Sequence, residues 1–361
     1  MEDIQTTLKK SVLILQTEIS AYDVECYNII SDSYDLTLAY FTKDKAAKEC
    51  RFKKVKLDSR SLGPFTFVKG VKKLAKQYDI VCIPPNLHYP SYCILPFLSH
   101  KYKVVSWSIG FRVSYDHPYK TERKHTILDW CFKKVLEACD ANIFYMNKAK
   151  DFWHGKINLN KVFVAINTTQ VNPLTILPEK KKNILFVGTL YKGKGVEKLL
   201  TTYMCLLEKT DNPLPLIVVG DGPERKVLEE FVTDHHLDNI VSFKGAIYDE
   251  NILMEYYSQA LISVSPNQAG LSVPKSMGYG VPYATRRDAI TGGEIYHITD
   301  GVNGFMYEND DDLLEILIDA SNNPSKYIEM GRKAKDYYDN NATVYHRANG
   351  AMTAFNYVRS L

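Results

Sequence analysis

The chain has 361 residues, 45% of them hydrophobic, and its formal net charge at pH 7 is +3. A chain of this length exceeds the size at which a single hydrophobic core usually stops growing, so two domains are expected. No run approaches the roughly 18 to 20 consecutive apolar residues of a membrane span, and the first residues contain no apolar signal core. These features argue against a membrane-spanning protein and lead us to expect a soluble, cytoplasmic one.

The two halves of the chain differ in charge. Residues 1–170 carry 26 Lys and Arg against 17 Asp and Glu, about +9, whereas the remainder carries 19 against 25, about −6. The basic clusters of the first half lie at residues 43–48, 51–56, 69–76 and 133–134. They suit an anionic membrane surface or a lipid-diphosphate acceptor, at up to about 1 kcal/mol per cation; a solvated surface is the alternative. Nucleic acid is disfavoured, because the cations are dispersed over several predicted helices and lack an aromatic-interleaved strand motif.

Short apolar runs alternate with helix-like segments along the whole chain, which is the pattern of βα repeats on parallel sheets. In the first half the predicted strands are residues 12–15, 36–41, 80–83, 104–107, 143–146 and 162–166, and the predicted helices include 70–77 and 125–138. In the second half the predicted strands are residues 184–187, 216–219, 240–243, 261–264, 283–285 and 305–307.

A connector that contains prolines and charges, residues 172–182, separates the two halves and is the best candidate for a hinge. The pattern therefore predicts an α/β protein with two doubly wound, Rossmann-like domains, at residues 1–172 and 173–342, that face each other across a cleft. Ligands of such sheets bind at the carboxyl ends of the strands.

The loop after the first strand of the second half is rich in Gly and Lys. Residues 183–188 form a strand of buried type, and residues 196–207 have the apolar spacing of a helix that packs on a sheet. The turn between them, GTLYKGKG, has the composition of an anion-binding loop. It is one residue short of a P-loop, because Gly195 stands where the magnesium-binding Ser or Thr belongs. A P-loop ATPase is disfavoured, since no later apolar run ends in a suitably placed Asp.

Residues 261–282, LISVSPNQAGLSVPKSMGYGVP, are the most informative part of the chain. The apolar run ends at Ser265 and Pro266, because proline cannot donate to a central sheet ladder. Gly270 and Leu271 then open a helical segment whose free N–H groups and positive dipole end suit a diphosphate.

This corner resembles that of the family 4 retaining glycosyltransferases of the GT-B fold, which reads Pro-Ser, Glu-Gly-Phe-Gly-Leu, Glu-Ala-Met-Ala and Gly-x-Pro-Val. The frame matches at six positions, Pro266, Gly270, Leu271, Met277, Gly280 and Pro282. The two family glutamates, which face the sugar and the ribose, are replaced by Asn267 and Lys275. We expect Asn267 to contact hydroxyls of the donor sugar. Lys275 has donors but no acceptor, so we expect it to contact the bound nucleotide in a different way from the family carboxylate.

The resemblance also assigns roles in the Gly- and Lys-rich loop. The family version places an Arg and a Lys on the donor diphosphate; here Gly188 keeps its place, Thr189 replaces the Arg, and Lys194 occupies the Lys position. Lys194 is therefore the expected catalytic cation. The candidates to replace the missing Arg are Lys192, Arg286 and Arg287. Solvated surface charge is the alternative interpretation of all three.

Three further positions match family turns. Gly220 begins a partial GxGxxG pattern that corresponds to the tight, chiefly structural turn after the second strand of the nucleotide domain. Gly245 belongs to a Phe-x-Gly turn near the nucleotide base. Glu294 follows a Gly-Gly segment, and its carboxylate can accept hydrogen bonds from both ribose hydroxyls. Ordinary surface exposure is the alternative for Glu294.

The first half offers less specific chemistry. The loop after its first strand, residues 16–20, lacks the glycines that the family usually has there. The loop after the fourth strand corresponds to the place where the family often has a polar group near the donor sugar, which makes Arg112 and His117 candidate catalytic residues. Ordinary loop surface is the alternative for both. The resemblance further implies that a last helix, within residues 343–361, packs back on the first domain.

No metal site is predicted. The seven Cys form no C-x-x-C pair, and the nine His form no i,i+4 pair backed by a carboxylate motif. This agrees with the resembled fold, which uses cationic side chains and helix dipoles where other transferases use Mg²⁺ or Mn²⁺. No cofactor besides the nucleotide-sugar donor is expected.

The sequence thus predicts a retaining glycosyltransferase that moves a sugar from a nucleoside-diphosphate sugar to a hydroxyl of a glycan or lipid-linked acceptor. The expected setting is polysaccharide or lipopolysaccharide biosynthesis, in the cytoplasm or at the inner face of the plasma membrane. Two alternatives stay open. One is a catalytically silent nucleotide- or glycan-binding partner subunit, which the lost glutamates favour; the other is a nucleotide-sugar epimerase or phosphorylase on the same fold.

Overall fold

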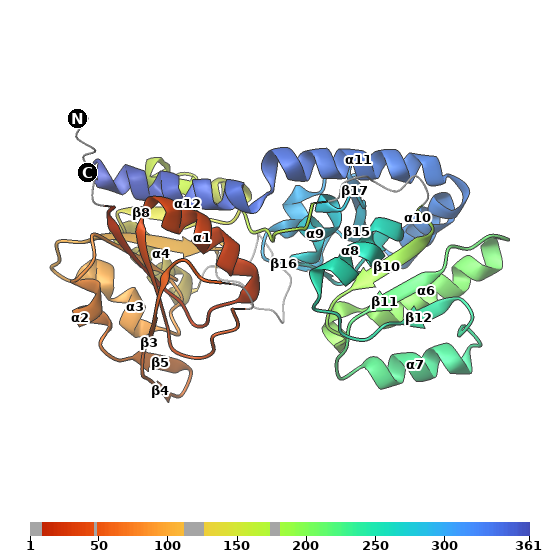
Figure 1. Cartoon of the computed structure of the whole chain (residues 1–361), viewed down its shortest axis with the longest axis horizontal. Coiled ribbons are helices and arrows are strands. Elements are labelled where there is room, and N and C mark those ends of the chain that lie inside the picture. The colour runs from red at the N-terminus through yellow and green to blue at the C-terminus, as the bar shows by residue number, and fades with distance from the viewer. Residues whose placement is uncertain (1–8, 47–48, 112–125, 174–180) are drawn as a thin grey trace, which may run out of the picture. The chain divides into compact units, whose positions relative to one another are not determined.

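The computed structural model describes residues 9–46, 49–111, 126–173 and 181–361 (Figure 1). The chain divides into two compact units. Among the described residues, the first unit contains those up to 167 together with 344–361, and the second contains those from 168 to 343. Along the described residues, the chain therefore passes from the first unit to the second after Asn167 and returns to the first unit at its last helix.

The first unit contains the following described elements. Its strands are β1 (Ser11–Leu15), β2 (Asp35–Tyr40), β3 (Lys53–Lys56), β4 (Ser59–Leu62), β5 (Phe65–Val68), β6 (Ile80–Ile83), β7 (Lys103–Ser108), β8 (Ala141–Phe144) and β9 (Val162–Val164). Its α-helices are α1 (Val24–Ser33), α2 (Val71–Ala75), α3 (Pro90–Cys93), α4 (Ile127–Ala138), α5 (Lys148–Trp153) and α12 (Val344–Arg359). Its 3-10 helices are η1 (Ala21–Asp23), η2 (Leu95–Phe97) and η3 (Leu159–Lys161).

The second unit lies between β9 and α12 in the sequence. Its strands are β10 (Asn183–Val187), β11 (Leu216–Val219), β12 (Val241–Phe243), β13 (Ala260–Val264), β14 (Gln268–Ala269), β15 (Tyr283–Arg286), β16 (Ile290–Thr291) and β17 (Gly304–Tyr307). Its α-helices are α6 (Val196–Lys209), α7 (Arg225–Asp234), α8 (Glu250–Gln259), α9 (Ser272–Gly278), α10 (Asp310–Asn322) and α11 (Pro324–Asn341). Its 3-10 helices are η4 (Lys192–Lys194) and η5 (Glu294–His297).

Both units are built on a parallel sheet with the same strand order. The order is β3-β2-β1-β6-β7-β8-β9 in the first unit and β12-β11-β10-β13-β15-β17 in the second. The first strand of each unit thus lies between its second and fourth strands, as in doubly wound dinucleotide-binding folds. The predicted pair of Rossmann-like domains is confirmed. This order places the ligand crevice of each unit outside the carboxyl ends of β1 and β6, or of β10 and β13.

The sequence explains why these segments become central strands and covering helices. β13 reads ALISV and is buried along its whole length, as expected for a parallel strand with helices on both faces. α6 buries Leu199, Tyr203 and Leu206 at helical spacing against the sheet. It begins after Gly195 and has Lys209 in its last turn, where a cation is favourable next to the negative end of the helix dipole.

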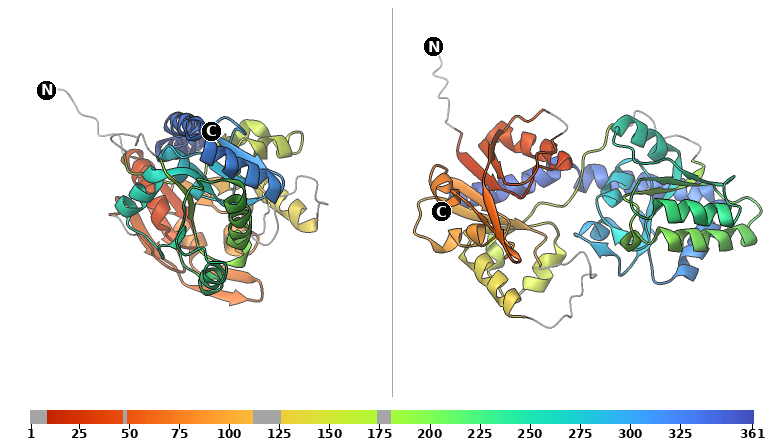
Figure 2. Two further views of the ribbon diagram at one scale, coloured as in Figure 1. Left: turned by 90° about the vertical axis from the view of Figure 1, so that its right-hand side faces the viewer. Right: turned by 90° about the horizontal axis from the view of Figure 1, so that it is seen from below.

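The last helix, α12, completes the core of the first unit (Figures 1 and 2). Ala348, Ala351 and Phe355 are buried among the residues of α1 and the sheet. Arg347 is buried too, and its guanidinium lies 2.7 Å from the carboxylate of Asp23. Burial raises the pKa of Asp23, and the charge of Arg347 opposes this rise. The helix is therefore fixed to the first unit by apolar packing and by one buried ion pair.

The segment that follows Asn167 packs with the second unit, whereas the sequence interpretation placed residues 168–172 in the first domain. The hydroxyl of Tyr338 donates to the main-chain oxygen of Thr169 at 2.8 Å. The main-chain N–H of Asn172 donates to the hydroxyl of Tyr279 at 3.1 Å. These bonds join distant parts of the chain, so apolar patterning could not reveal them.

The sequence pattern did not predict β3 or the hairpin formed by β4 and β5. β3 reads KKVK and lies at the edge of the sheet beside β2, where a charged strand protects against pairing with other chains. The hairpin is a separate two-stranded sheet that turns at Gly63. Among the helices that the structure describes, none combines the length and the apolar character needed to cross a bilayer.

Candidate functional site

Three of the predicted binding glycines lie close together where β10, β11 and β12 end. The main-chain N–H of Gly220 donates to the oxygen of Gly245 at 2.8 Å. A Cβ atom on Gly220 would stand 1.8 Å from the main-chain oxygen of Gly188, and the φ angle of Gly220 is 150°. Only glycine tolerates this contact and this backbone angle. Because these glycines approach so closely, main chain rather than side chains lines the crevice of the second unit there.

Lys194 lies at the end of η4, in the loop that follows β10. A Cβ on Gly188 would lie 3.6 Å from Nζ of Lys194, so the ammonium lies beside that main chain. Burial lowers the pKa of Lys194, and the charge of Glu294 opposes this effect. An anionic ligand would favour the charged form and so would bind this half-buried cation well. Thr189, at the position of the family Arg, and Lys192 are exposed.

Asn267 joins three loops of the second unit. Its main-chain N–H donates to the oxygen of Lys194 at 3.3 Å, and its main-chain oxygen accepts from the N–H of Ile290 at 2.9 Å. Its side-chain amide lies against Gly195, where a Cβ would come within 2.5 Å of Nδ2. Asn267 therefore stands where the loops after β10, β13 and β15 meet. These are the loops that the sequence assigns to the diphosphate, the sugar and the ribose.

Glu294 is buried, with 3% of its surface exposed, so the alternative of ordinary surface exposure is wrong. Its Oε2 accepts from Oγ1 of Thr291 at 3.0 Å and from the main-chain N–H of Gly292 at 2.7 Å. β14 and β16 pair in parallel, with Ala269 opposite Thr291, which brings this loop beside the loop that follows β13. The carboxylate also interacts electrostatically with Lys194. Glu294 is thus part of the same group of loops.

Gly270 and Leu271 precede α9. A Cβ on Gly270 would meet no described atom within 4 Å, so the main chain there borders open space. The oxygens of Gly270 and Leu271 accept from the first turn of the helix, at 2.9 and 3.2 Å. α9 has only seven residues; the N–H groups of Val273 and Lys275 are already used in these bonds, and Pro274 has none. The main-chain N–H groups of Gly270 and Leu271, just before the helix, are therefore what this segment can offer an anion.

Lys275 lies on α9, and its ammonium donates to both carboxylate oxygens of Glu250, at 2.7 and 2.8 Å. Glu250 is the first residue of α8. The Lys275 side chain is 15% exposed and that of Glu250 is 36% exposed. The ammonium that we expected on the nucleotide is thus held within the chain. A carboxylate therefore does lie beside position 275, where the family has its ribose-binding Glu, but it belongs to Glu250 on α8.

Sequence reasoning missed Glu250. No motif surrounds it, and its role becomes visible only through its partner. The available signal was the charge reversal at Lys275, because a Lys that replaces an acid on a partly buried helix face is stabilised by an acidic neighbour.

Arg286 and Arg287, two candidates for the missing family Arg, are engaged in ion pairs. Arg286 donates to Asp288 at 2.9 Å. Arg287 donates to Glu308 at 2.7 Å and to Asp300 at 2.9 Å. These hydrogen bonds raise the pKa of both arginines. Either residue would have to leave a carboxylate in order to bind a diphosphate.

Arg112 and His117, the predicted catalytic residues of the first half, lie outside the described residues, as do residues 174–180 of the predicted hinge. Within the described ranges, no group of three or more His, Cys, Asp and Glu could hold a metal ion. The metal independence of the reaction stays a prediction.

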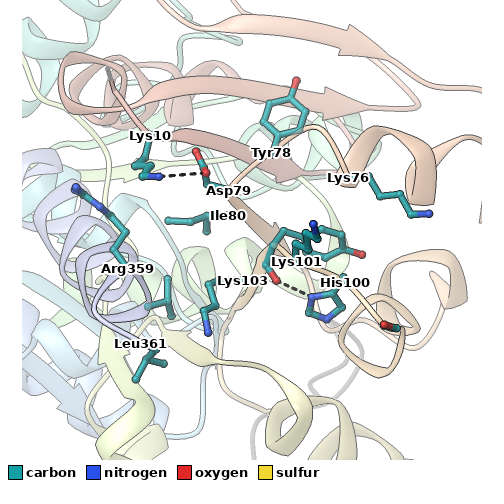
Figure 3. Close-up of a pocket in the computed structure, with 13 residues that line it drawn as sticks. Lys10, Lys76, Tyr78, Asp79, Ile80, His100, Lys101, Lys103, Arg359 and Leu361 are labelled. Atoms are coloured by element: carbon teal, nitrogen blue, oxygen red, sulfur yellow. Dashed lines mark hydrogen bonds and ion pairs between the residues drawn. The ribbon is translucent and has the colours of Figure 1, made fainter. Parts of the chain in front are cut away.

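A pocket of about 760 Å³ lies in the first unit, at the other edge of its sheet (Figure 3). It is lined by residues before β1, β6 and β7 and at the end of α12, among them Lys10, Lys101, Lys103 and Arg359. The ammonium of Lys10 lies 3.4 Å from the carboxylate of Asp79. Ligands of doubly wound sheets bind at the carboxyl ends of strands. This cationic pocket at the amino ends is therefore not the counterpart of the crevice in the second unit.

Residues 172–337 match the family model of the glycosyl transferases group 1. The match contains the whole cluster from Gly188 to Glu294 described above. The family model thus covers most of the second unit, and the predicted resemblance to a GT-B glycosyltransferase is confirmed.

Curated relatives match parts of this chain. An uncharacterized glycosyltransferase of Haemophilus influenzae is 27% identical over 56% of this chain and 57% of its own length. The GDP-mannose-dependent alpha-mannosyltransferase of Corynebacterium glutamicum is 34% identical over 36% of this chain and 28% of its own length. The alpha-monoglucosyldiacylglycerol synthase of Acholeplasma laidlawii is 22% identical over 43% of this chain and 40% of its own length. The chain thus spans about half the length, or less, of these relatives.

Solved structures resemble the chain over nearly its whole length. Anabaena HepE in complex with UDP has a TM-score of 0.70 at 16% identity, and the match covers 96% of this chain and 99% of that one. TarM has a TM-score of 0.72 at 12% identity, with 98% and 100% covered. At these identities the likeness concerns the fold alone. The chain has the GT-B fold, as predicted.

Proposed function

We propose that the protein is a glycosyltransferase that moves a sugar from a nucleoside-diphosphate sugar to a hydroxyl of a glycan or lipid-linked acceptor. The observation that carries the proposal is the junction at Asn267, which ties three loops together beside Lys194. A nucleotide-sugar donor agrees with the GDP-mannose named for one relative and with the UDP named for the HepE complex. The proposed setting is polysaccharide or lipopolysaccharide assembly.

The chemical task is to support departure of a diphosphate while the sugar develops positive charge. In the proposed mechanism, the Lys194 ammonium and the main-chain N–H groups of Gly270 and Leu271 receive the negative charge that develops on the leaving phosphate. A burial-lowered pKa does not prevent this, because the diphosphate itself favours the charged form of Lys194. Asn267 is proposed to bind hydroxyls of the donor sugar.

We further propose that the reaction retains the configuration of the sugar. The leaving phosphate then accepts the proton of the acceptor hydroxyl as the new bond forms. This route needs no pair of carboxylates at the spacing that glycosidases use. It also requires no metal, since the cation and the N–H donors neutralise the diphosphate.

A half-buried carboxylate is proposed to recognise the nucleoside, and a buried one to support the neighbouring loop. Glu250 would accept hydrogen bonds from ribose hydroxyls, while Lys275 holds its carboxylate in place from α9. Glu294 is held by Thr291 and Gly292 and supports the loop beside Lys194. In this arrangement Lys275 is a positioning residue. Glu250 on α8 takes the role that the family gives to a Glu on α9.

A second candidate is a nucleotide- or glycan-binding partner subunit without activity. The replacement of both motif glutamates, by Asn267 and Lys275, favours it. Such a protein would keep the binding crevice but would not break the bond to the sugar.

Incubation with a panel of nucleotide sugars, with release of free nucleotide as the readout, tests the proposal. We expect release from one donor, accelerated by a glycan or lipid-linked acceptor and strongly reduced in Lys194→Ala. Lys198→Ala, an exposed cation on α6, is the matched control and should behave as wild type. Calorimetric binding of a nucleotide without release from any donor would support the silent subunit instead.

A further inference from the structure

The hairpin of β4 and β5 presents apolar side chains to solvent on one face. Leu62, Phe65 and Phe67 are 69%, 42% and 42% exposed. The two strands pair in antiparallel register, with Leu62 opposite Phe65 and Arg60 opposite Phe67. Since side chains alternate between the faces of a strand, these four residues share one face. Three apolar side chains and one cation therefore form a single exposed surface.

The outer edge of β5 is hydrogen-bonded to other parts of the first unit, and Val68 anchors the end of β5 on the opposite face. Val68 is buried, and the hydroxyls of Ser61 and Thr66 are hydrogen-bonded at 3.1 Å. The main-chain N–H of Thr66 donates to the oxygen of His88 at 2.8 Å, and that of Val68 donates to Oγ of Ser91 at 3.0 Å. These bonds hold the hairpin so that its apolar face stays outward. Figure 1 shows it at the lower edge of the first unit.

The same stretch carries charge of one sign. Residues 59–78 contain five basic residues and no acidic one, namely Arg60, Lys69, Lys72, Lys73 and Lys76. All five are exposed, and none of them forms an ion pair with another residue of the described ranges. An apolar surface flanked by such cations has the composition of peptide surfaces that bind anionic membranes.

We propose that this hairpin, together with α2, docks the protein on an anionic lipid surface. Leu62, Phe65 and Phe67 enter the boundary between headgroups and acyl chains, and the basic residues contact lipid phosphates. The inference deepens the proposed function and rests on it in one respect, because a lipid-linked acceptor is presented at such a surface. A second copy of the chain is the rival occupant, since β4 is an exposed edge strand. Charge disfavours that rival, because two copies would bring like charges together.

Sedimentation of the full chain with sucrose-loaded vesicles tests the docking. We expect binding to vesicles of phosphatidylcholine mixed with phosphatidylglycerol and little binding to phosphatidylcholine alone. Lys72→Ala/Lys73→Ala should weaken binding about 25-fold, from about 1 kcal/mol for each cation near the lipid. Leu62→Ser/Phe65→Ser/Phe67→Ser should weaken it at least about tenfold, because apolar area no longer enters the boundary.

The matched control, Val227→Ser/Tyr248→Ser/Ile252→Ser, removes three exposed apolar side chains from the second unit and should bind vesicles as wild type does. Circular dichroism melting checks that every variant is folded. Equal binding to both kinds of vesicle, or equal loss in the control, would overturn the proposal. So would a dimer, seen by sedimentation velocity, that the hairpin variant dissociates while vesicle binding is unchanged.

The two levels of inference fail in different ways. Vesicle binding needs no turnover, so a vesicle-bound wild-type protein without nucleotide release counts against the proposed function alone. A wild-type protein that turns over a soluble acceptor but does not bind anionic vesicles counts against the docking alone.

Discussion

The two units have the same strand order, yet the loops at their crevices differ in kind. In the second unit, Gly188 follows β10, and Gly220 packs against its carbonyl, so main chain borders the crevice. In the first unit, Gln16 follows β1. Its side-chain amide donates to the hydroxyl of Tyr27 at 3.1 Å, and its main-chain oxygen accepts from the hydroxyl of Tyr92 at 3.3 Å.

Under the proposed function, this difference fits two kinds of ligand on one scaffold. Main-chain N–H groups and a single Lys suit a diphosphate, which needs many donors at short range. Amide and hydroxyl side chains suit sugar hydroxyls, which both donate and accept. We therefore expect changes in the loops of the second unit to affect the donor, and changes in the core of the first unit to affect the scaffold.

The largest effect is expected in the first unit, at Arg347. Arg347→Ala leaves the Asp23 carboxylate buried without its partner, so the free energy of unfolding should fall by about 3–5 kcal/mol. Urea-induced unfolding, followed by circular dichroism, measures it. Arg359→Ala, at the exposed end of the same helix, is the control and should cost less than about 1 kcal/mol. A similar small loss for Arg347→Ala would show that α12 is held by its apolar face alone.

In the second unit, a buried cation below α9 should make stability depend on pH. Nζ of Lys181 donates to the oxygen of Gly280 at 2.8 Å, and burial lowers the pKa of Lys181 to about 7 from 10.5. Between these values the unfolded chain holds a proton that the folded chain does not. The free energy of unfolding should therefore rise with pH, by up to about 1.4 kcal/mol per pH unit. Below pH 7 both states are protonated, and the cost of burying the ammonium is fully present.

Lys181→Met removes the titrating group, so its advantage over wild type should shrink as pH rises from 7 to 10.5. Urea unfolding at a series of pH values across this range measures the difference. Lys182→Met, at the exposed neighbouring position, is the control and should keep the wild-type slope. An unchanged slope in Lys181→Met would mean that another group titrates.

The pair of Lys275 and Glu250 tests whether the ribose carboxylate has moved to α8. Lys275→Ala and Glu250→Gln should each weaken nucleotide binding by about 1.5–3 kcal/mol, the range for hydrogen bonds to charged groups. The double variant should lose less than the sum, because both changes break one interaction. Calorimetry measures the affinities, with Glu255→Gln on the same helix as the control.

Lys275→Glu, which restores the family residue, sharpens this test. It places a second carboxylate against Glu250, so it should bind nucleotide no better than Lys275→Ala does. If it binds better than wild type, the carboxylate has not moved, and the substitution at Lys275 is a loss rather than an exchange.

A smaller effect is expected at Lys194, and it should appear in turnover rather than in binding. The charge on the leaving phosphate is larger in the transition state than in the bound donor, so Lys194→Ala should lower kcat at least about tenfold. Steady-state release of nucleotide measures it. A wild-type kcat would remove Lys194 from the mechanism.

The smallest effect is expected from removal of metal ions. If Lys194 and main-chain donors neutralise the diphosphate, then EDTA should leave donor turnover nearly unchanged. Activity that EDTA abolishes and Mn²⁺ restores would contradict this architecture of the site.

Much of the fold could be predicted because its signals are local. The apolar runs that became β10, β11 and β13 each carry the pattern of a buried parallel strand, and the turns between them contain the expected glycines. β3 and the hairpin could not be predicted in this way. Their residues are charged or exposed, so no buried pattern marks them. β3 becomes a strand by pairing with the earlier strand β2, and β4 and β5 become strands by pairing with each other.

The residues of the candidate site likewise fall into those that local signals predict and those that they do not. Gly188, Lys194 and Asn267 follow strands that the sequence reveals, and parallel strands deliver their ends to one edge. Glu250 could not be found from its own neighbourhood, because it matters only through its distance from Lys275. The sequence could not decide whether Glu294 is buried, for the same reason. The loop that contains it is fixed by the pairing of β14 with β16.

The return of α12 to the first unit also has a consequence for folding during synthesis. The hydroxyl of Tyr34 donates to Oδ1 of Asn356 at 2.6 Å across 322 residues of sequence. During synthesis, α12 is made after every described strand of the second unit, so the core of the first unit cannot be completed until then. The half that is made first is therefore completed last, and until then the apolar surface of α1 that receives α12 stays exposed to chaperones and proteases.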